Sequence, residues 1–276
     1  MNERIWLPSR RGLLRAGAAA ALGGGAALLA ACGSSKAAAP GGSSTTSSAA
    51  TSSTAGLGDN GTTITIRQAP GAVTLSGALD ASWQGIPAVN LDPNDPGVAT
   101  NGVSSQTPSF TSQIYFQWDP TSLYALEVRT QSPPFENTGA DAQYYLGDCF
   151  MMFFNTAQTT GTSYVEGDYA FFITPFNGTD VSPRAWDREG HTGGANEHDI
   201  TSDVKMGYKT TAAGYNFVMA LPWKEIQVTA PWTPKKGATL QFSIGGASQT
   251  SGGTWGQLQY NGQDDNSGSW GTLALA

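Results

Sequence analysis

Beyond Gly61, hydrophobic residues never repeat at helical spacing over three turns, and this constrains the fold more than any other property of the sequence. Short runs of β-branched and aromatic residues recur instead, bounded by Gly, Pro, Asn or Asp, as in strands separated by turns. The expected strands are residues 62–67, 73–75, 113–118, 123–130, 148–155, 169–174, 204–210, 215–221, 240–248, 256–260 and 271–275. So many short strands predict an all-β domain, a two-sheet antiparallel β-sandwich.

Two segments of this domain differ from their surroundings. Residues 150–154 read Phe-Met-Met-Phe-Phe, so both faces of that strand are apolar. Such a strand is central between two layers, or its second face lines an apolar pocket. Residues 177–202 are polar and Gly-rich and contain Trp186 and both histidines, which predicts a long excursion loop.

The first 31 residues are typical of an export signal. A basic stretch, Arg4–Arg15, precedes a weakly apolar core, Ala16–Leu29, which is too short and too rich in Gly for a membrane-spanning helix of about 20 apolar residues. Within the basic stretch, Ser9–Leu14 resembles a twin-arginine signal. Residues 29–33 (Leu-Ala-Ala-Cys-Gly) resemble a bacterial lipobox, which implies cleavage before Cys32 and attachment of a lipid, with acyl chains such as palmitate, to its thiol.

Residues 32–60 are expected to form a disordered tether. They are mostly Ser, Thr, Ala and Gly, without an aromatic residue, and cannot bury enough apolar area to offset their ordering entropy. The sequence therefore predicts a signal peptide (1–31), a lipidated linker (32–60) and one folded domain (61–276). Acyl chains on Cys32 would hold this domain on the cell membrane or outer envelope, outside the cytoplasm.

Charge excludes nucleic acid as an expected partner. The sequence carries a formal net charge of −7, of which residues 1–31 contribute +3, leaving −10 for the remainder. Such a surface repels phosphate backbones, and no basic stripe interrupts it. Of the two cysteines, Cys32 is assigned to the lipid, so Cys149 has no partner for an intramolecular disulfide.

Five segments of the domain, taken in order, resemble the motifs of family 9 carbohydrate-binding modules and their DOMON-like relatives. They are residues 75–83 (LSGALDASW), 114–124 (IYFQWDPTSLY), 147–155 (GDCFMMFFN), 214–226 (GYNFVMALPWKEI) and 270–273 (WGTL). Together they span nearly all of residues 73–275. The resemblance implies a DOMON-like sandwich of the jelly-roll type that binds carbohydrate, an oligo- or polysaccharide, without catalysis.

The same resemblance implies a sugar slot beside the 148–155 strand. In sugar-binding members an aromatic residue three positions before the Asp of that strand forms one wall, and Tyr145 holds this position. An aromatic residue of the last loop forms the second wall, for which Tyr260 is the candidate and Trp255 the reserve. Aromatic rings stack on the C–H faces of sugars.

Amide side chains around Tyr260 are candidates for binding the sugar hydroxyls. They are Gln257 and Asn261, with Gln259 and Gln263 beside them, and amides both donate and accept hydrogen bonds. Met151 stands where the family has a glutamate on the strand. A thioether accepts hydrogen bonds only weakly, so this substitution alters the chemistry of the expected site.

A haem-binding redox module is an alternative from another class. Some DOMON relatives hold haem b with Met and His or Lys ligands, and here Met151, Met152 and Met219 lie on expected strands while His191 and His198 lie in the expected loop. Haem ligation needs two such groups and an apolar slot. We expect instead that the methionines fill gaps in the core, as flexible thioethers do, and that no cofactor is bound.

The sequence bears on three further functions. Residues 92–95 (Asp-Pro-Asn-Asp) and 264–266 (Asp-Asp-Asn) offer oxygen ligands for Ca²⁺, without the spacing of a known calcium loop. A structural or protein-binding surface lipoprotein is also compatible with the sequence. An enzyme is not expected, because the chain contains no G-x-S-x-G, H-E-x-x-H or Gly-rich phosphate-binding motif.

Overall fold

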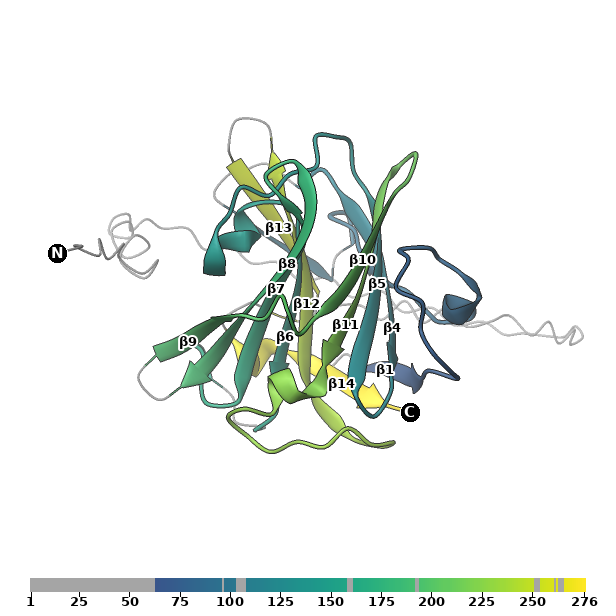
Figure 1. The fold of residues 1–276 in the computed structure, drawn as a ribbon. Coiled ribbons are helices and arrows are strands. Elements are labelled where there is room, and N and C mark those ends of the chain that lie inside the picture. The colour runs from purple at the N-terminus through teal and green to yellow at the C-terminus, as the bar shows by residue number, and fades with distance from the viewer. Residues whose placement is uncertain are drawn as a thin grey trace, which may run out of the picture. The chain divides into compact units, whose positions relative to one another are not determined.

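The computed structural model describes residues 63–95, 97–102, 108–157, 161–191, 194–250, 254–260, 262 and 266–276. This part of the chain is almost entirely β-structure, as the sequence predicts (Figure 1). Its strands are β1 (Thr63–Gln68), β2 (Val89–Leu91), β3 (Val98–Gly102), β4 (Thr111–Trp118), β5 (Ser122–Thr130), β6 (Cys149–Asn155), β7 (Asp168–Asn177), β8 (Asp180–His191), β9 (Gly194–Asp199), β10 (Lys205–Thr210), β11 (Gly214–Pro222), β12 (Thr239–Thr250), β13 (Thr254–Tyr260) and β14 (Gly271–Leu275). The short 3-10 helices are η2 (Ala81–Trp83), η3 (Asp141–Leu146), η4 (Trp223–Ile226) and η5 (Ser267–Ser269). Within the described ranges no helix has the length and hydropathy needed to cross a bilayer.

The strands form two layers that are joined along one edge. The β5 sheet has the order β10-β11-β5-β4, with β2 beside β4, and the β6 sheet has the order β14-β12-β6-β7-β8-β9, with β13 and β3 continuing from β12. Strand β1 links them, because Thr63–Ile66 pair in parallel with β14 while Arg67 and Gln68 pair in parallel with β4. The other pairings of the described strands are antiparallel. The expected sandwich is confirmed, with parallel pairing only at this junction.

The main core lies between the two sheets and is built from every second residue of each strand. On β6, Phe150, Met152 and Phe154 point inward, and they meet residues such as Phe217 of β11 and Phe242 of β12, all fully buried. The ring centroids of Phe154 and Phe242 are 5.0 Å apart. Burial of each such side chain contributes roughly 1.5–3 kcal/mol to folding, so this layer provides most of the stabilisation.

One end of the interior is polar. The fully buried guanidinium of Arg129, on β5, lies with its Cζ 3.7 Å from the ring centroid of Phe110. Its nitrogens are 3.5 Å from a carboxylate oxygen of Glu127 and 3.9 Å from one of Asp148. Burial raises the pKa of Glu127 above its ordinary value, although Arg129 and the Ser112 hydroxyl act to lower it. This cluster is structural, because the surrounding groups are buried with it.

The segment expected to be a loop, residues 177–202, is instead largely the hairpin of β8 and β9. Strand β8 pairs with β7 in antiparallel register, so that Ala185 joins the main core while Trp186 and Arg188 face the other side. The prediction was wrong because this hairpin lies at the edge of the sheet. A buried strand has apolar residues at its alternate positions, whereas these edge strands have polar residues there, as a loop does.

Residues 73–75, expected to be a strand, belong to a covering segment on the outer face of the β5 sheet. There Trp83 of η2 is buried against Leu126 and Val218, with Val73 and Leu75 packed around them. The outer face of the β6 sheet is covered in a different way, by η3 and by Trp270. The second covering brings the candidate site together.

Candidate functional site

The outer face of the β6 sheet carries a second, smaller apolar cluster. Cys149, Met151 and Phe153 of β6 lie there, together with Phe172 of β7, and Tyr144 and Trp270 cover them. All seven residues of β6 are buried. Of the two interpretations of this doubly apolar strand, the structure therefore shows the first, a central strand covered on both faces.

At the rim of this cluster, five side chains form what we call the platform: Tyr145, Tyr164, Phe172, Arg188 and Glu197. The rings of Tyr145 and Phe172 have centroids 5.9 Å apart and are tilted by 54°. The Arg188 guanidinium carbon lies 5.7 Å from the ring centroid of Phe172 and 5.7 Å from that of Tyr164. Arg188 donates from Nε to Oε1 of Glu197 at 2.9 Å, and its Nη2 is 2.8 Å from the same oxygen. Three aromatic rings thus adjoin one ion pair.

Strand register brings the platform together. In the antiparallel ladder Ala170 pairs with Arg188, and Arg188 pairs with Glu197, so opposite charges face each other across the β8/β9 hairpin. Phe172 pairs with Trp186, the next outward position of each strand. The positions of Phe172, Arg188 and Glu197 in the platform are therefore a direct consequence of alternation along β7, β8 and β9.

Tyr145 is positioned by the anchoring of η3. The Asn137 side chain donates to the carbonyl oxygens of Tyr144, at 2.7 Å, and Asp148, at 3.1 Å. A side chain at Gly147 would put its Cβ 2.6 Å from the Asn137 Cα, so only glycine allows this close approach. The chain between η3 and β6 is thus held closely, and Tyr145 is half-buried at its edge.

The platform keeps charge and aromatic surface within reach of solvent. The Arg188 side chain is 27% exposed and that of Glu197 is 38% exposed. Burial acts to lower the pKa of Arg188, but Tyr164, Glu197 and Tyr145 outweigh it and hold that pKa above its ordinary value. Phe172 is buried, so the half-buried rings of Tyr145 and Tyr164 are the ones that can take the C–H face of a ligand. The ion pair beside them can donate to and accept from its hydroxyls.

The structure places the predicted site residues on both faces of the β6 sheet. Met151 and Gln257 lie on the same outer face as the platform, but both are buried. The Gln257 amide donates to the Gln259 side chain at 3.3 Å, and Gln259 donates to the Ser243 hydroxyl at 3.1 Å. Within the described part of the chain, these buried amides therefore form hydrogen bonds with each other and with Ser243 beneath the surface.

Tyr260 lies on the opposite face, packed against the main core, so the structure does not bring it together with Tyr145 as two walls of one slot. Trp255 lies on β13, where it pairs with Gln249 and is two positions from Gln257. Its side chain is not among those that the structure describes. Asn261 and Cys32 also lie outside the described residues. Of the predicted wall residues, Tyr145 is the one that the described structure places on the platform.

Sequence reasoning missed Tyr164, Phe172, Arg188 and Glu197. A signal for the ion pair existed, because Arg188 and Glu197 are nine positions apart with a Gly-rich stretch between them, the spacing of facing residues in a hairpin. The prediction of a loop over residues 177–202 obscures that signal.

The groups considered for haem or metal binding are spread apart. Met152 and Met219 are fully buried in the main core, Met151 lies on the other face of its sheet, and the His198 side chain is 53% exposed at β9. His191 has no described side chain, and Asp264 and Asp265 lie outside the described residues.

In the 92–95 segment, the Asp92 and Asp95 carboxylates accept hydrogen bonds from the backbone amides of Asn94 and Gly97, at 2.8 and 2.9 Å. They thus act as ordinary turn caps. Among the residues that the structure describes, no three His, Cys, Asp or Glu side chains are grouped to hold a metal ion.

The fold is the one that the sequence motifs imply, a β-sandwich like that of family 9 carbohydrate-binding modules. A module of this family from Caldicellulosiruptor kristjanssonii, solved in complex with cellotriose, superposes with a TM-score of 0.55 and 16% sequence identity over 78% of this chain and 93% of that chain. Its complex with glucose gives a TM-score of 0.55 and 15% identity over 78% of this chain and 96% of that chain.

A candidate carbohydrate-binding protein from Bacteroides uniformis has a TM-score of 0.52 and 10% identity, covering 79% of this chain and the whole of that chain. No protein-family model and no curated protein matches the sequence. At these identities the comparisons establish the fold.

Proposed function

We propose that the protein binds a carbohydrate without catalysis, and that it binds it on the platform. One observation carries the proposal: Tyr145, Phe172 and Tyr164 adjoin the partly exposed Arg188–Glu197 ion pair. Flat rings beside groups that both donate and accept hydrogen bonds are what a pyranose requires. The structural neighbours that were solved with cellotriose and glucose support the same ligand class.

The proposal includes the location of the domain. The lipobox-like sequence of residues 29–33 and the Ser-, Thr-, Ala- and Gly-rich residues after it support a lipoprotein anchored through Cys32 on the outer side of a membrane. The domain would then capture an oligo- or polysaccharide close to the cell surface. In a cell fractionation experiment we expect the wild-type protein in the membrane fraction and the Cys32→Ser variant outside it; an unchanged distribution would contradict the anchor.

Affinity electrophoresis through gels that contain soluble polysaccharides tests the ligand class. We expect at least one β-glucan or related glycan to retard the protein. The Tyr145→Ala variant should lose most of the retardation, because removal of a well-packed ring lowers the binding free energy by about 1–3 kcal/mol.

The matched control for this experiment is Tyr260→Ala, since Tyr260 is a partly buried tyrosine that packs against the main core, away from the platform. It should be retarded like the wild type. Retardation of neither protein by any glycan of a broad panel, or equal loss in both variants, would contradict the proposed function.

A further inference from the structure

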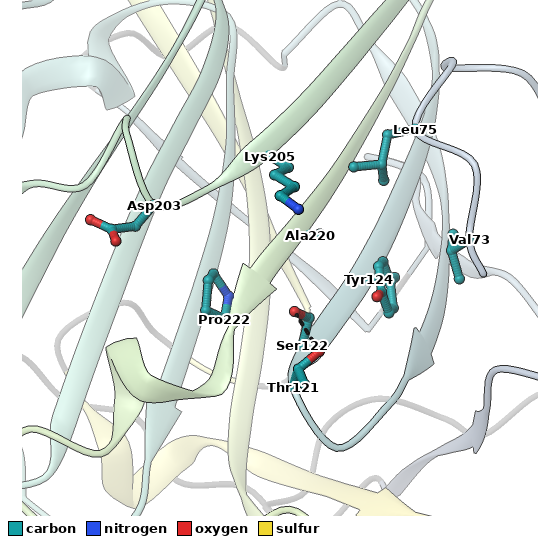
Figure 2. A pocket seen from close by; sticks show the side chains of 9 residues that line it. All are labelled: Val73, Leu75, Thr121, Ser122, Tyr124, Asp203, Lys205, Ala220 and Pro222. Atoms are coloured by element: carbon teal, nitrogen blue, oxygen red, sulfur yellow. Dashed lines mark hydrogen bonds between the residues drawn. The ribbon is translucent and has the colours of Figure 1, made fainter. Parts of the chain in front are cut away.

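A hollow lies on the outer face of the β5 sheet, away from the platform. Its volume is about 190 Å³, and Figure 2 shows the side chains around it: Val73, Leu75, Thr121, Ser122, Tyr124, Asp203, Lys205, Ala220 and Pro222. The starts of β5 and β10 and the end of β11 form its floor, and the covering segment at residues 73–75 forms one side.

The wall at Tyr124 is fixed by a hydrogen-bond network. The Tyr124 hydroxyl donates to Oδ2 of Asp119 at 2.7 Å, while the Thr121 hydroxyl and the backbone amide of Ser122 donate to Oδ1 of the same carboxylate at 2.6 and 2.8 Å. Burial and Asp119 raise the pKa of Tyr124 to about 12. The ring is therefore neutral and held in one orientation before any ligand arrives.

Lys205 is the unpaired charge of the hollow. It is exposed and forms no ion pair with any residue that the structure describes, whereas the nearby Asp203 is already bound by Lys224. In Figure 2 the Lys205 side chain, Leu75 and Tyr124 flank one space, and the Asp203 carboxylate lies on the far side. An ammonium donor and the Ser122 hydroxyl thus adjoin an apolar wall.

We propose that this hollow is a second carbohydrate subsite, which takes a single pyranose unit of a glycan. Its volume lies below the roughly 300 Å³ at which pockets for drug-sized ligands begin, so it suits one ring. Val73, Leu75 and Tyr124 would contact the C–H face, while Lys205 and Ser122 bind hydroxyls.

The position of this subsite has a functional consequence. The platform and the hollow lie on the outer faces of different sheets, with the main core between them. One short oligosaccharide molecule therefore binds at one site or the other. A polysaccharide that presents many chains can bind at both sites of one protein molecule at once, which increases its overall affinity. This inference takes its ligand class from the proposed function but depends on a different set of residues.

A nuclear magnetic resonance titration with glucose and cellotriose tests the subsite, using the Tyr145→Ala variant so that the platform is disabled. We expect saturable shifts of the amide signals of β5, β10 and β11 near Ser122, Lys205 and Ala220. We expect Lys205→Ala, introduced into the same background, to weaken this binding by roughly tenfold, as loss of one charged hydrogen bond does.

Lys209→Ala is the matched control, because Lys209 is an exposed lysine on the same face of β10. It should leave the titration unchanged. No shift at these amides at saturating sugar, or equal affinities for the Lys205→Ala and Lys209→Ala proteins, would overturn the subsite. The platform is reported separately by the η3 and β8 amides of the wild-type protein, so failure of one site does not imply failure of the other.

Discussion

Arg129 and Arg188 make similar contacts in opposite surroundings. Each guanidinium lies over an aromatic ring, that of Phe110 for Arg129 and that of Phe172 for Arg188, and each adjoins a carboxylate. The Arg129 side chain has no exposed surface, whereas 27% of the Arg188 side chain is exposed. The same chemical groups therefore serve the fold inside the sandwich and remain available to a ligand outside it.

Access to water explains the difference. Inside, the cost of desolvating three charges is offset only while all of them are present, so the cluster must stay complete. Outside, water screens the Arg188–Glu197 pair, which contributes little to stability and can exchange its partners for ligand hydroxyls. The comparison predicts large effects on stability for one arginine and large effects on binding for the other.

Removal of Arg129 should have the largest effect. In the Arg129→Met variant, Glu127 and Asp148 lose their buried cation, and we expect the free energy of unfolding to fall by roughly 3–5 kcal/mol. Urea denaturation followed by tryptophan fluorescence measures this change. The control, Arg67→Met, removes an exposed arginine whose hydrogen bonds to described residues go to the backbone carbonyls of Ser82 and Gln84. It should change stability by less than about 0.5 kcal/mol. Equal stability of the two variants would show that the buried cluster is not structural.

Removal of Arg188 should separate binding from folding. We expect the Arg188→Ala variant to unfold within about 1 kcal/mol of the wild type but to bind saccharide roughly 10- to 100-fold more weakly, because charged hydrogen bonds to the ligand are lost. Titration calorimetry gives the affinity, and Arg67→Ala is the matched control. An affinity equal to that of the control would remove Arg188 from the site.

On the other face of β8, Asp187 is a buried carboxylate that forms no ion pair with an arginine among the described residues. Burial, Glu189 and Glu225 raise the pKa of Asp187 to about 7. The folded protein therefore keeps a proton that the unfolded chain releases near pH 4, so stability should decrease as pH rises from about 4 to 7.

We expect the Asp187→Asn variant to be more stable than the wild type by roughly 1–2 kcal/mol at pH 8, after allowing for partial solvent screening, and no more stable below pH 4. Thermal unfolding at the two pH values measures the difference. A stability gain that is the same at both pH values would contradict the assigned protonation.

The sequence predicted most of the fold, because apolar runs such as those of β6, β7 and β11 are buried on both faces. The β8/β9 hairpin was missed because alternation with polar residues at a sheet edge resembles a loop. Tyr260 was expected to form the second wall of a slot with Tyr145, but it packs against the main core. The sequence held a signal for this, because Tyr260 alternates in step with Leu258, an apolar residue of the same core. The platform joins five segments, namely η3, the chain before β7, and strands β7, β8 and β9. The alignment of the three strands is set by a register that local composition does not encode.

The central claim is that a sugar binds on the platform, and a crystal structure of the protein with the saccharide selected by electrophoresis tests it most directly. We expect a pyranose ring in van der Waals contact with Tyr145 and hydrogen-bonded to Arg188 or Glu197. An ordered sugar held elsewhere on the domain, with the platform bare, would contradict the account.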